Sequence, residues 1–469
     1  MGVKHNCGFC VTHTLHDAYS FIKSLQHRGR EAAGIAFIGK DRIDVIKWIG
    51  PVDRFEIKDL YKLFPSEKYH TYMAHVRYAT RGRKDKILQD AHPVVIGGKI
   101  EDRDSHVIIT DCKGVMVHNG QVDEKYLNGI DKKKLNGETD SEALLHKYLE
   151  SDEKKILLEV HGSYSLAIAS KKERSVIILR DKTGIKPCSL GWKDGKYVIA
   201  SEDIAFHKNG ANFIEDIKPG CVCYIYPEGN CSYKRIVKSN EKHCFFEYNY
   251  IADIGSILDG VSVRRIRELL GEELAEEFSI KADLVTFLPR CPEVAARKFA
   301  EKLKIEFADV FYKTRDERSF LGSTPEDRKN SISNNLFLLS KINGRDPKEA
   351  IDGKTVVIID DSTIRGNNSR RAIKLLKENC SPKKIYLINY TPKIGIVPKD
   401  GIPRGCTYGV DMPPNDDFIA RDKTDVEISK SIGAEVLFLS VDGMLKVFEK
   451  LGIPRDNLCY FCIGGEKPF

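Results

Sequence analysis

Cys7 is the first residue of this sequence whose type and position could do chemistry. It opens the short motif Cys7-Gly8-Phe9, after residues 1–6. If residues 1–6 are removed as a propeptide, Cys7 gains an α-amine, with a pKa of about 7.7 to 8.0 in model peptides, beside its thiol. One residue then supplies both a nucleophile and a base. Taken alone, Cys7 is better explained as a structural cysteine, and the motifs described below change that interpretation. Cys10 is a competing nucleophile, but it lacks a following glycine, so we prefer Cys7.

Two adjacent carboxylates mark a second candidate site. The run 355–359 reads as a buried apolar strand, and Asp360 and Asp361 follow it directly. A short loop with Gly366 comes next, and a helix is predicted from Ser369. Loop amides and a helix N-terminus can bind a phosphate, while paired carboxylates at the end of a strand can accept hydrogen bonds from ribose hydroxyls. For an isolated Asp-Asp pair, the simpler interpretation is an acidic strand end before an ordinary helix cap.

The cysteines form a third group. Their number, thirteen, is odd for a closed disulfide framework, and a reducing compartment would disfavour disulfides, so metal binding or catalysis explains some of them. Cys459 and Cys462 form a C-x-x-C pair near the C-terminus, with Cys244 and Cys406 far upstream. The pair by itself indicates zinc, iron–sulfur or redox use without choosing among them. No role is assigned to Cys112, Cys188, Cys221, Cys223, Cys231, Cys291 and Cys380.

Short β-type runs dominate the first half of the chain and must position Cys7. They lie at 32–38, 106–110, 163–169, 175–179, 196–200 and 222–226, and turn residues separate them. Helices are predicted at 15–25 and 140–148, the second with a cap at Thr139 or Asp140. Such runs favour antiparallel sheets, and the first half therefore reads as α+β with layered antiparallel sheets between helices.

The pattern of apolar residues changes after Asp259-Gly260. A helix is predicted at 264–278, and apolar strands then alternate with helices. The strands are predicted at 282–288, 305–311, 355–359, 384–389 and 435–439, and the helices at 294–303 and 369–378. This alternation predicts an α/β domain with a parallel sheet covered on both faces. The polar segment 314–334 has little periodicity and is predicted to be a mobile loop over that sheet.

Length and composition exclude several classes of protein. The chain has 469 residues, of which 41% are hydrophobic and 30% charged, as in a globular protein of two or three domains. The formal net charge of +7 is too dilute to indicate nucleic-acid binding, although it could favour phosphorylated small molecules. No apolar stretch approaches the roughly 18 residues that cross a bilayer, and the start lacks the apolar core of a signal peptide. We therefore expect a cytoplasmic protein without a membrane partner.

Four motifs in the first half, in register, resemble the signature of the N-terminal-nucleophile glutamine amidotransferases. They are Leu25-Gln26-His27-Arg28-Gly29-Arg30-Glu31-Ala32-Ala33-Gly34-Ile35, His75-Val76-Arg77-Tyr78-Ala79-Thr80, His118-Asn119-Gly120 and Thr139-Asp140-Ser141-Glu142. Individually, Arg77 and Asp140 could be a solvated pair and Asn119-Gly120 a hairpin turn. Those interpretations do not predict all four motifs together.

The resemblance implies a role for each of these residues. Cys7 is the nucleophile, and Arg28, Arg77 and Asp140 bind glutamine, with Arg77 on the α-carboxylate and Asp140 on the α-ammonium group. The Asn119 side chain and the Gly120 backbone N–H bind the oxyanion. These assignments are chemically sensible, because a guanidinium fork suits a carboxylate and fixed donors stabilise a tetrahedral intermediate.

The second half resembles the type I phosphoribosyltransferases. The run Asp360-Asp361-Ser362-Thr363-Ile364-Arg365-Gly366 is similar to their 5-phosphoribosyl-1-pyrophosphate signature. An amidotransferase half followed by this half is the architecture of the amidophosphoribosyltransferase family. Further resemblance lies in Phe246-Glu247-Tyr248, in Asp259-Gly260-Val261-Ser262-Val263, and in Lys313-Thr314-Arg315 with Arg318-Ser319-Phe320. It implies that Lys313, Arg315 and residues 360–366 bind the phosphoribosyl substrate with Mg²⁺, and that ammonia freed at Cys7 crosses an internal channel to the ribose C1.

The cysteine set completes the resemblance. Cys244, Cys406, Cys459 and Cys462 are similar in context to the cluster ligands of the iron–sulfur branch of the family, which implies a 4Fe-4S cluster. Zinc remains the second metal candidate, and four unrelated core cysteines are the alternative to any metal. The family also implies feedback by purine nucleotides and a homodimer or homotetramer.

Three short segments depart from the family pattern. Arg81-Gly82-Arg83 stands where the family usually has Ala-Gly-Ser. Pro289-Arg290-Cys291-Pro292 replaces Pro-Asp-Ser-Gly in the pyrophosphate loop, and Gly366-Asn367-Asn368-Ser369 replaces Gly-Thr-Thr-Ser. The second change exchanges a carboxylate for a cation and removes a glycine that could let the backbone approach a ligand closely.

The sequence therefore predicts two domains and a two-step enzyme. Residues 7–241 form the amidotransferase domain, residues 242–469 the phosphoribosyltransferase domain with its C-terminal cluster segment, and residues 1–6 a propeptide. The predicted reaction converts glutamine, 5-phosphoribosyl-1-pyrophosphate and water to 5-phosphoribosylamine, pyrophosphate and glutamate, the first committed step of purine synthesis. One alternative is a paralogue that keeps glutaminase chemistry with a lost or altered phosphoribosyl acceptor. The other is a non-catalytic nucleotide-sensing regulator.

Overall fold

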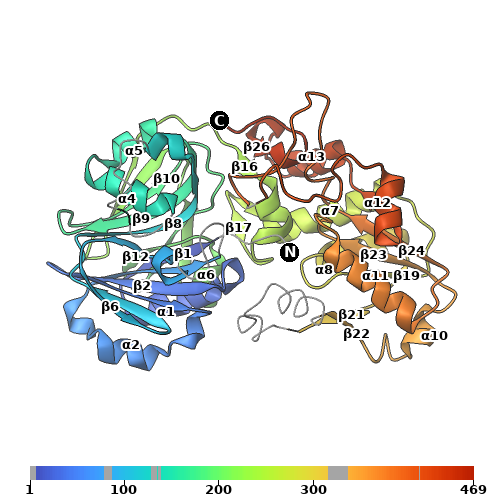
Figure 1. Ribbon diagram of the computed structural model, residues 1–469, viewed down its shortest axis with the longest axis horizontal. Coiled ribbons are helices and arrows are strands. Elements are labelled where there is room, and N and C mark those ends of the chain that lie inside the picture. The colour runs from blue at the N-terminus through green and yellow to red at the C-terminus, as the bar shows by residue number, and fades with distance from the viewer. Residues whose placement is uncertain (1–6, 79–86, 128–134, 136–138, 315–335, 411) are drawn as a thin grey trace.

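The computed structural model describes residues 7–78, 87–127, 135, 139–314, 336–410 and 412–469. The chain forms two halves that lie side by side, the first mostly β-sheet and the second a mixture of helices and strands (Figure 1). Several predicted segments lie outside the described residues: the predicted propeptide 1–6, the segment Arg81-Gly82-Arg83, the residues Arg315 and 318–320, and almost all of the predicted loop 314–334.

Two antiparallel sheets build the first half. The larger has nine strands in the order β13-β11-β12-β1-β4-β2-β3-β7-β6. In that order the strands span Asn212–Asp216, Ser189–Lys193, Lys196–Ala200, Gly8–Thr12, Thr71–Arg77, Ala32–Ile38, Ile43–Ile49, His106–Thr110 and Lys99–Arg103. The smaller sheet has six strands in the order β15-β14-β10-β9-β8-β5, which span Cys231–Arg235, Cys221–Ile225, Val176–Arg180, Gly162–Ser170, Gly114–Val122 and Val94–Ile96.

The two sheets pack face to face, with helices on the outside. Side chains of both sheets, including Phe9 and Val11 from β1 and Val115 and Val117 from β8, form one buried cluster. The outer face of the larger sheet packs on α1 (Leu15–Ser24), α2 (Ile57–Leu63) and α6 (Ile204–Lys208). The outer face of the smaller sheet packs on α4 (Asp140–Leu149) and α5 (Glu153–Glu159). The predicted α+β half with layered antiparallel sheets is confirmed.

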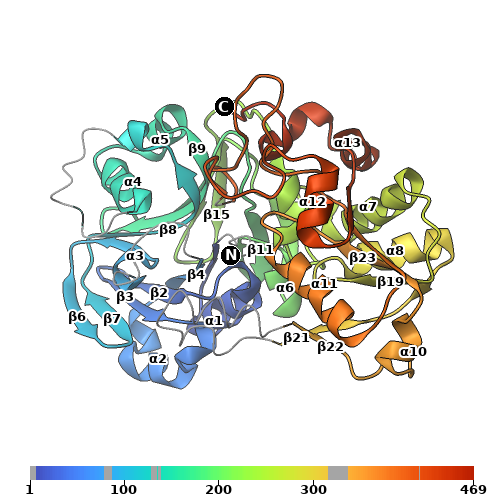
Figure 2. The ribbon, with the colours of Figure 1, turned by 45° about the vertical axis from the view of Figure 1, so that its right-hand side comes forward.

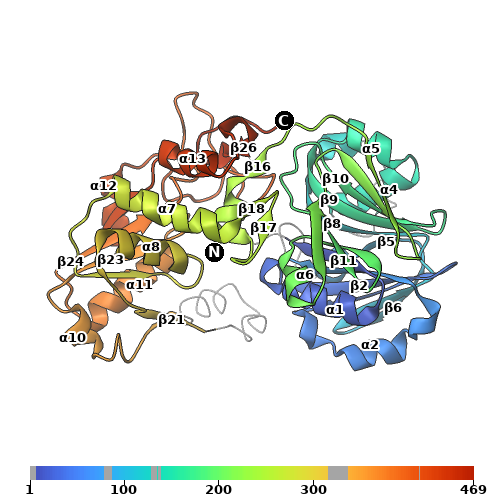
Figure 3. The ribbon, with the colours of Figure 1, turned by 180° about the vertical axis from the view of Figure 1, so that it is seen from behind.

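A parallel sheet forms the centre of the second half. Its order is β20-β19-β23-β24-β25, with strands Glu306–Phe307, Leu284–Phe287, Thr355–Asp360, Lys384–Asn389 and Glu435–Phe438, and every pairing is parallel. Helices α11 (Asn367–Asn379) and α12 (Asp425–Ile432) pack on one face. The other face packs on α7 (Val263–Glu277), α8 (Glu293–Leu303) and α13 (Val441–Lys450). Figure 3 shows the molecule from behind, with these three helices in view. The predicted α/β half is confirmed.

Most predicted elements agree with the structure, and two do not. The six strands and two helices predicted in the first half all appear within one residue of the predicted bounds. The strand predicted at 305–311 is present but too long, because β20 pairs in the sheet only over Glu306–Phe307. The chain then leaves the sheet and starts a separate hairpin of β21 (Phe311–Lys313) with β22 (Leu336–Leu338). Helix α11 begins at Asn367 rather than Ser369, because Gly366 adopts a φ of +77° and forms its N-cap.

Short elements complete the chain. The first half also contains Gln26–Arg28, Val52–Arg54, Ser66–Lys68, α3 (Ile87–Asp90) and Glu124–Leu127. The second half contains β16 (His243–Cys244), a π-helix at Glu247–Ile251, β17 (Ile257–Leu258), β18 (Val261–Ser262), α10 (Pro347–Ile351), Arg455–Asn457, β26 (Leu458–Cys459) and Phe461–Ile463. β16 pairs in parallel with β26, so the end of the chain lies where the two halves meet, as Figure 2 also shows. No helix in the described residues is long and apolar enough to span a bilayer.

Candidate active sites

Cys7 lies directly before β1, an interior strand of the larger sheet between β12 and β4. Its Sγ lies 3.8 Å from the carbonyl oxygen of Tyr78, the residue that directly follows β4, which pairs with β1. Burial raises the pKa of the Cys7 thiol, while the carbonyl contact and the positive charges of Arg77, Lys186 and Arg28 lower it. Because burial is the larger effect, the thiol is protonated at neutral pH and needs a base to become a nucleophile.

A fully buried arginine fixes the position of Cys7. Arg28 donates from Nε to the carbonyl oxygen of Cys7 at 2.9 Å. Its other nitrogens contact Glu202 and Glu247, the latter at 3.0 and 3.1 Å. With both ends of the guanidinium occupied by carboxylates, Arg28 orients Cys7 through its backbone. The two glutamates were not identified from the sequence, and the only signal for Glu247 was the motif Phe246-Glu247-Tyr248.

The residues assigned to the two ends of glutamine lie on different elements. Arg77 ends β4 and contacts Glu31 at 3.0 Å and Asp90 at 3.7 Å. Asp140 is the first residue of α4, and its Oδ2 accepts a hydrogen bond from the backbone N–H of Val122 on β8 at 2.8 Å. Arg77 thus ends a strand of the larger sheet, whereas Asp140 begins a helix and is hydrogen-bonded to β8 of the smaller sheet. A guanidinium and a carboxylate are the groups that can bind the two charged ends of an α-amino acid.

Asn119 and Gly120 lie on β8, and both have features of an oxyanion site. The Asn119 side chain is completely buried, and within the described part of the chain neither its nitrogen nor its oxygen has a hydrogen-bond partner. A buried side-chain amide whose N–H groups have no hydrogen-bond acceptor is rare in a folded interior. Gly120 has a φ of +149°, and a Cβ there would lie 2.0 Å from the carbonyl oxygen of Ser163. The backbone at position 120 therefore excludes any side chain.

Three buried histidines connect the strands that carry these groups. Nε2 of His75 on β4 lies 3.1 Å from the carbonyl oxygen of His118 on β8. The rings of His75 and His92 stack at 4.4 Å, and His118 Nδ1 lies 2.9 Å from Ser141 Oγ on α4. Burial lowers the pKa of all three, that of His75 to about 3. They are therefore neutral, and they fix β4, β8 and α4 relative to one another.

In the second half, Asp360 and Asp361 lie at the carboxyl end of β23. Burial raises the pKa of Asp361 to about 6, and burial together with the charge of Asp361 raises that of Asp360. Ser362 Oγ donates to Asp361 Oδ2 at 2.7 Å. Two adjacent buried carboxylates are held at an energetic cost, which a ligand with hydroxyl donors or positive charge would relieve.

The loop after this pair leads into the N-terminus of α11. Thr363 Oγ1 donates to Asn389 Oδ1 at 2.7 Å and lies 3.4 Å from Ser369 Oγ. Gly366 has a φ of +77°, at which any other residue would be strained, and a Cβ there would also lie 2.7 Å from the Ile432 side chain. Arg365 contacts Asp416 at 3.1 Å through Nε. The loop is thus held on both sides, and α11, with 13 residues, presents its first N–H groups beside it.

Lys313, the last residue of β21, lies near the carboxylate pair, and Arg290 contacts Lys313. Burial lowers the pKa of Lys313, while the charges of Asp361 and Asp360 raise it. Arg290, in the segment that departs from the family, is exposed and donates from Nη2 to the carbonyl oxygen of Lys313 at 3.3 Å. The structure therefore places Lys313 beside the two aspartates and Arg290 beside Lys313.

The four cysteines compared with cluster ligands lie near one another. Cys244 and Cys459 are directly paired on β16 and β26, and Cys406 Sγ accepts hydrogen bonds at 3.3 Å from the N–H groups of Gly409 and Val410. Burial raises the pKa of Cys462, and the charges of the three other thiols add to the effect. However, no three His, Cys, Asp or Glu side chains of the described residues are arranged to hold one metal ion.

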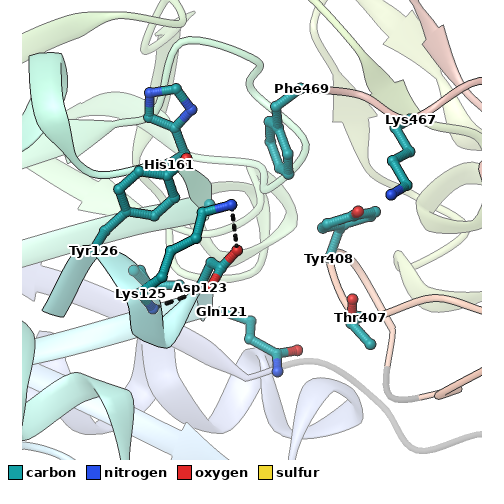
Figure 4. Close-up of a pocket in the computed structure, with 11 residues that line it drawn as sticks. Gln121, Asp123, Lys125, Tyr126, His161, Thr407, Tyr408, Lys467 and Phe469 are labelled. Atoms are coloured by element: carbon teal, nitrogen blue, oxygen red, sulfur yellow. Dashed lines mark hydrogen bonds and ion pairs between the residues drawn. The ribbon is translucent and has the colours of Figure 1, made fainter. Parts of the chain in front are cut away.

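A pocket of about 460 Å³ opens between the two halves. Figure 4 shows Tyr126 and His161 on one wall and Tyr408 and Lys467 on the other. The Tyr126 and His161 rings stack at 4.6 Å. Strand β8 forms part of the lining through Gln121 and Val122, which follow the oxyanion residues. The pocket suits a small molecule in size, and among the described residues none that is assigned by resemblance lines it.

Comparison with known proteins gives matches to both halves. Residues 100–208 match the model of a glutamine amidotransferase domain. The amidophosphoribosyltransferase of Methanocaldococcus jannaschii is 30% identical over 96% of this chain and 93% of its own length. That of Bacillus subtilis is 29% identical over 96% of this chain and 90% of its own. A solved structure of glutamine phosphoribosylpyrophosphate amidotransferase from B. subtilis, complexed with ADP and GMP, has a TM-score of 0.78, 27% identity, and coverage of 98% and 97% of the two chains.

Proposed function

The chain belongs to the amidophosphoribosyltransferase family, and on that premise we propose which of its residues carry out each half of the reaction. It is a glutamine-dependent amidophosphoribosyltransferase of purine biosynthesis. The observation that carries this function is the similarity over 96% of the chain, because it spans both halves and both sets of motifs. Neither the paralogue nor the nucleotide-sensing regulator gains support from the comparisons.

We assign glutamine hydrolysis to Cys7 after removal of residues 1–6. The free α-amine of Cys7 takes the proton of the thiol, and the sulfur attacks the side-chain carbonyl carbon of glutamine. Asn119 Nδ2 and the Gly120 N–H donate to the oxyanion of the tetrahedral intermediate. The C–N bond then breaks, the amine returns its proton to the departing nitrogen, and ammonia leaves. Water cleaves the thioester and gives glutamate.

The substrate is oriented by charge. Arg77 takes the α-carboxylate of glutamine in place of one of its present carboxylate neighbours, and Asp140 takes the α-ammonium group. Arg28 supports glutamine hydrolysis indirectly, because its guanidinium donates a hydrogen bond to the Cys7 carbonyl. We therefore place Arg28 in the site as a residue that orients the nucleophile.

We assign the phosphoribosyl substrate to the carboxyl end of β23. Asp360 and Asp361 accept hydrogen bonds from the ribose hydroxyls, and residues 362–366 with the N-terminus of α11 hold the 5-phosphate. Lys313 and Arg315 contribute positive charge toward the pyrophosphate. Mg²⁺ fits this site, because Asp360 and Asp361 offer the oxygen ligands that it prefers, and it would neutralise charge on the leaving pyrophosphate.

We propose a 4Fe-4S cluster on Cys244, Cys406, Cys459 and Cys462. All four thiols are buried, and the charges of Cys244, Cys406 and Cys459 act on Cys462. A single zinc ion needs all its ligands at about 2.3 Å from one point, and no three such side chains of the described residues are so arranged. In a cubane cluster each thiolate bonds a different iron, so a spread set of sulfurs fits it better. Four protein ligands leave no open position, and the role is structural.

The remaining assignments complete the proposal. The amidotransferase domain covers residues 7–241 and the phosphoribosyltransferase domain residues 242–469. Purine nucleotides are the feedback ligands, in line with the ADP and GMP bound to the B. subtilis protein. The protein is a cytoplasmic homodimer or homotetramer. The reducing compartment that an iron–sulfur cluster needs supports this location, as do thirteen cysteines that are all free thiols.

One assay tests the function directly. Purified enzyme with phosphoribosyl pyrophosphate and Mg²⁺ should form phosphoribosylamine from glutamine and also from ammonia. No product from ammonia, with iron content intact, would overturn the synthase assignment. Changing Arg290 to Asp, Cys291 to Ser and Pro292 to Gly then tests the loop, since an enzyme adapted to Arg290 should lose activity.

A further inference from the structure

The π-helix Glu247–Ile251, here called the junction helix, lies between the two active sites. Its first residue contacts the amidotransferase half. Glu247 accepts two hydrogen bonds from Arg28 Nη2 at 3.0 and 3.1 Å, and Arg28 Nε donates to the Cys7 carbonyl at 2.9 Å. Only one side chain therefore separates the junction helix from the backbone of the proposed nucleophile.

The middle of the junction helix contacts the phosphoribosyl half. The carbonyl oxygen of Asn249 accepts a hydrogen bond from the Tyr390 hydroxyl at 2.7 Å and one from Cys291 Sγ at 3.3 Å. Asn249 Nδ2 donates to Thr391 Oγ1 at 3.1 Å. Tyr390 and Thr391 follow β24, and their N–H groups donate to the carbonyl oxygens of Asp360 and Asp361 at 3.2 and 3.1 Å.

These contacts leave little freedom for independent movement. Arg28, Asn249, Tyr390 and Thr391 are completely buried, and Glu247 is 2% exposed. A shift at either end must move the junction helix or leave a buried polar group without a partner, which is costly. Short π-helical segments occur often at functional sites and are rare elsewhere. The contacts form one continuous path from Asp360 and Asp361 to Cys7.

We propose that Tyr390 and Glu247 are positioning residues that couple the two sites through the junction helix. Binding of the phosphoribosyl substrate at Asp360 and Asp361 moves the end of β24. The Tyr390 hydroxyl transmits that movement to Asn249, and Glu247 transmits it through Arg28 to Cys7. The inference rests on the function proposed above, because an enzyme that couples its two half-reactions should hydrolyse glutamine faster when phosphoribosyl pyrophosphate is bound. It adds which residues carry that effect.

The test compares two buried tyrosines, each of which donates a hydrogen bond from its hydroxyl to a backbone carbonyl oxygen. Tyr390→Phe removes the hydroxyl that donates to Asn249, and Tyr248→Phe removes a hydroxyl that donates to the carbonyl oxygen of Leu258 at 3.0 Å, off the path. The readout is the ratio of glutaminase rates with and without phosphoribosyl pyrophosphate. Loss of one buried hydrogen bond predicts a fall of about fivefold in this ratio for Tyr390→Phe. Tyr248→Phe should keep the ratio of the unmodified enzyme.

Basal glutaminase and ammonia-dependent synthesis serve as controls for Tyr390→Phe, and both should stay within about twofold of the unmodified enzyme. An unchanged ratio in Tyr390→Phe, or an equal fall in both tyrosine variants, would overturn the path. Absence of ammonia-dependent synthesis in the unmodified enzyme would instead overturn the function itself. The two failures are therefore distinguishable.

A second substitution tests the continuity of the path. Glu247→Gln weakens the contact with Arg28, and it should also lower the ratio. If both residues act along one path, the double variant should show little further loss beyond the larger single effect. Independent, multiplying losses would contradict a single path through the junction helix.

Discussion

Replacing Asp361 with asparagine should change stability and ligand binding in opposite directions. Asp360 and Asp361 are 6% and 8% exposed, and they are adjacent. Burial raises the pKa of Asp361 to about 6 in the folded protein, against about 3.9 in an unfolded chain. Between these values the folded state binds more protons than the unfolded state, so the free energy of unfolding falls as the pH rises through this window. At pH 7 the destabilisation by Asp361 is complete.

The magnitude follows from the difference between the two pKa values. About two pH units correspond to roughly 3 kcal/mol, at about 1.4 kcal/mol per unit. Asparagine keeps an oxygen that can accept the 2.7 Å hydrogen bond from Ser362. Asp361→Asn should therefore raise the free energy of unfolding at pH 7 by about 2 to 3 kcal/mol. The same change weakens hydrogen bonds to ribose by about 1.5 to 3 kcal/mol, or roughly tenfold to a hundredfold in affinity.

Urea unfolding of ligand-free protein in EDTA, at pH 7 and pH 4, measures the first effect. The gain at pH 7 should shrink markedly at pH 4, because Asp361 is then protonated in the folded state. Titration with phosphoribosyl pyrophosphate and Mg²⁺ measures the second. Asp309→Asn, at an exposed position 4.0 Å from Arg297, is the control and should change stability by less than about 0.5 kcal/mol. A less stable Asp361→Asn at pH 7, or one with unchanged affinity, would refute the reasoning.

Three further predictions concern the nucleophile, the oxyanion site and the cluster. The intact mass of active enzyme should show Cys7 as the first residue, and full activity with residues 1–6 attached would exclude the mechanism in which the α-amine of Cys7 is the base. Cys7→Ala should lose glutamine-dependent synthesis but keep ammonia-dependent synthesis. Gly120→Ala should lower the glutaminase rate by about 100-fold or more, because its Cβ would lie 2.0 Å from the Ser163 carbonyl oxygen and displace the proposed oxyanion donor. A rate within tenfold of the unmodified enzyme would count against the Gly120 N–H as that donor. Anaerobically purified protein should contain about four iron and four sulfide per chain, and Cys462→Ser should lower both, whereas zinc without sulfide would remove the cluster assignment.

Local patterns in the sequence were enough to predict most elements. The apolar run at 355–359 and the glycine at 366 correctly predicted a strand, a loop and a helix, because periodicity and turn residues act over a few neighbours. The same reasoning failed at 305–311, where the chain leaves the sheet between β20 and β21. Nothing within that run marks the end of pairing, since pairing depends on a partner strand elsewhere in the chain.

Only the tertiary structure decided what the charged groups do. Arg28 was expected among the residues that bind glutamine, and the fold surrounds it with Glu202 and Glu247, which are 174 and 219 residues away. Likewise, Lys313 lies near Asp360 and Asp361 because the hairpin of β21 and β22 packs beside the end of β23, and Arg290 contacts Lys313 from another segment. The sequence by itself determined which residue types are available and at which strand ends they occur. The packing of distant segments determined their partners and their pKa values, because burial and charge pairing depend on neighbours in space.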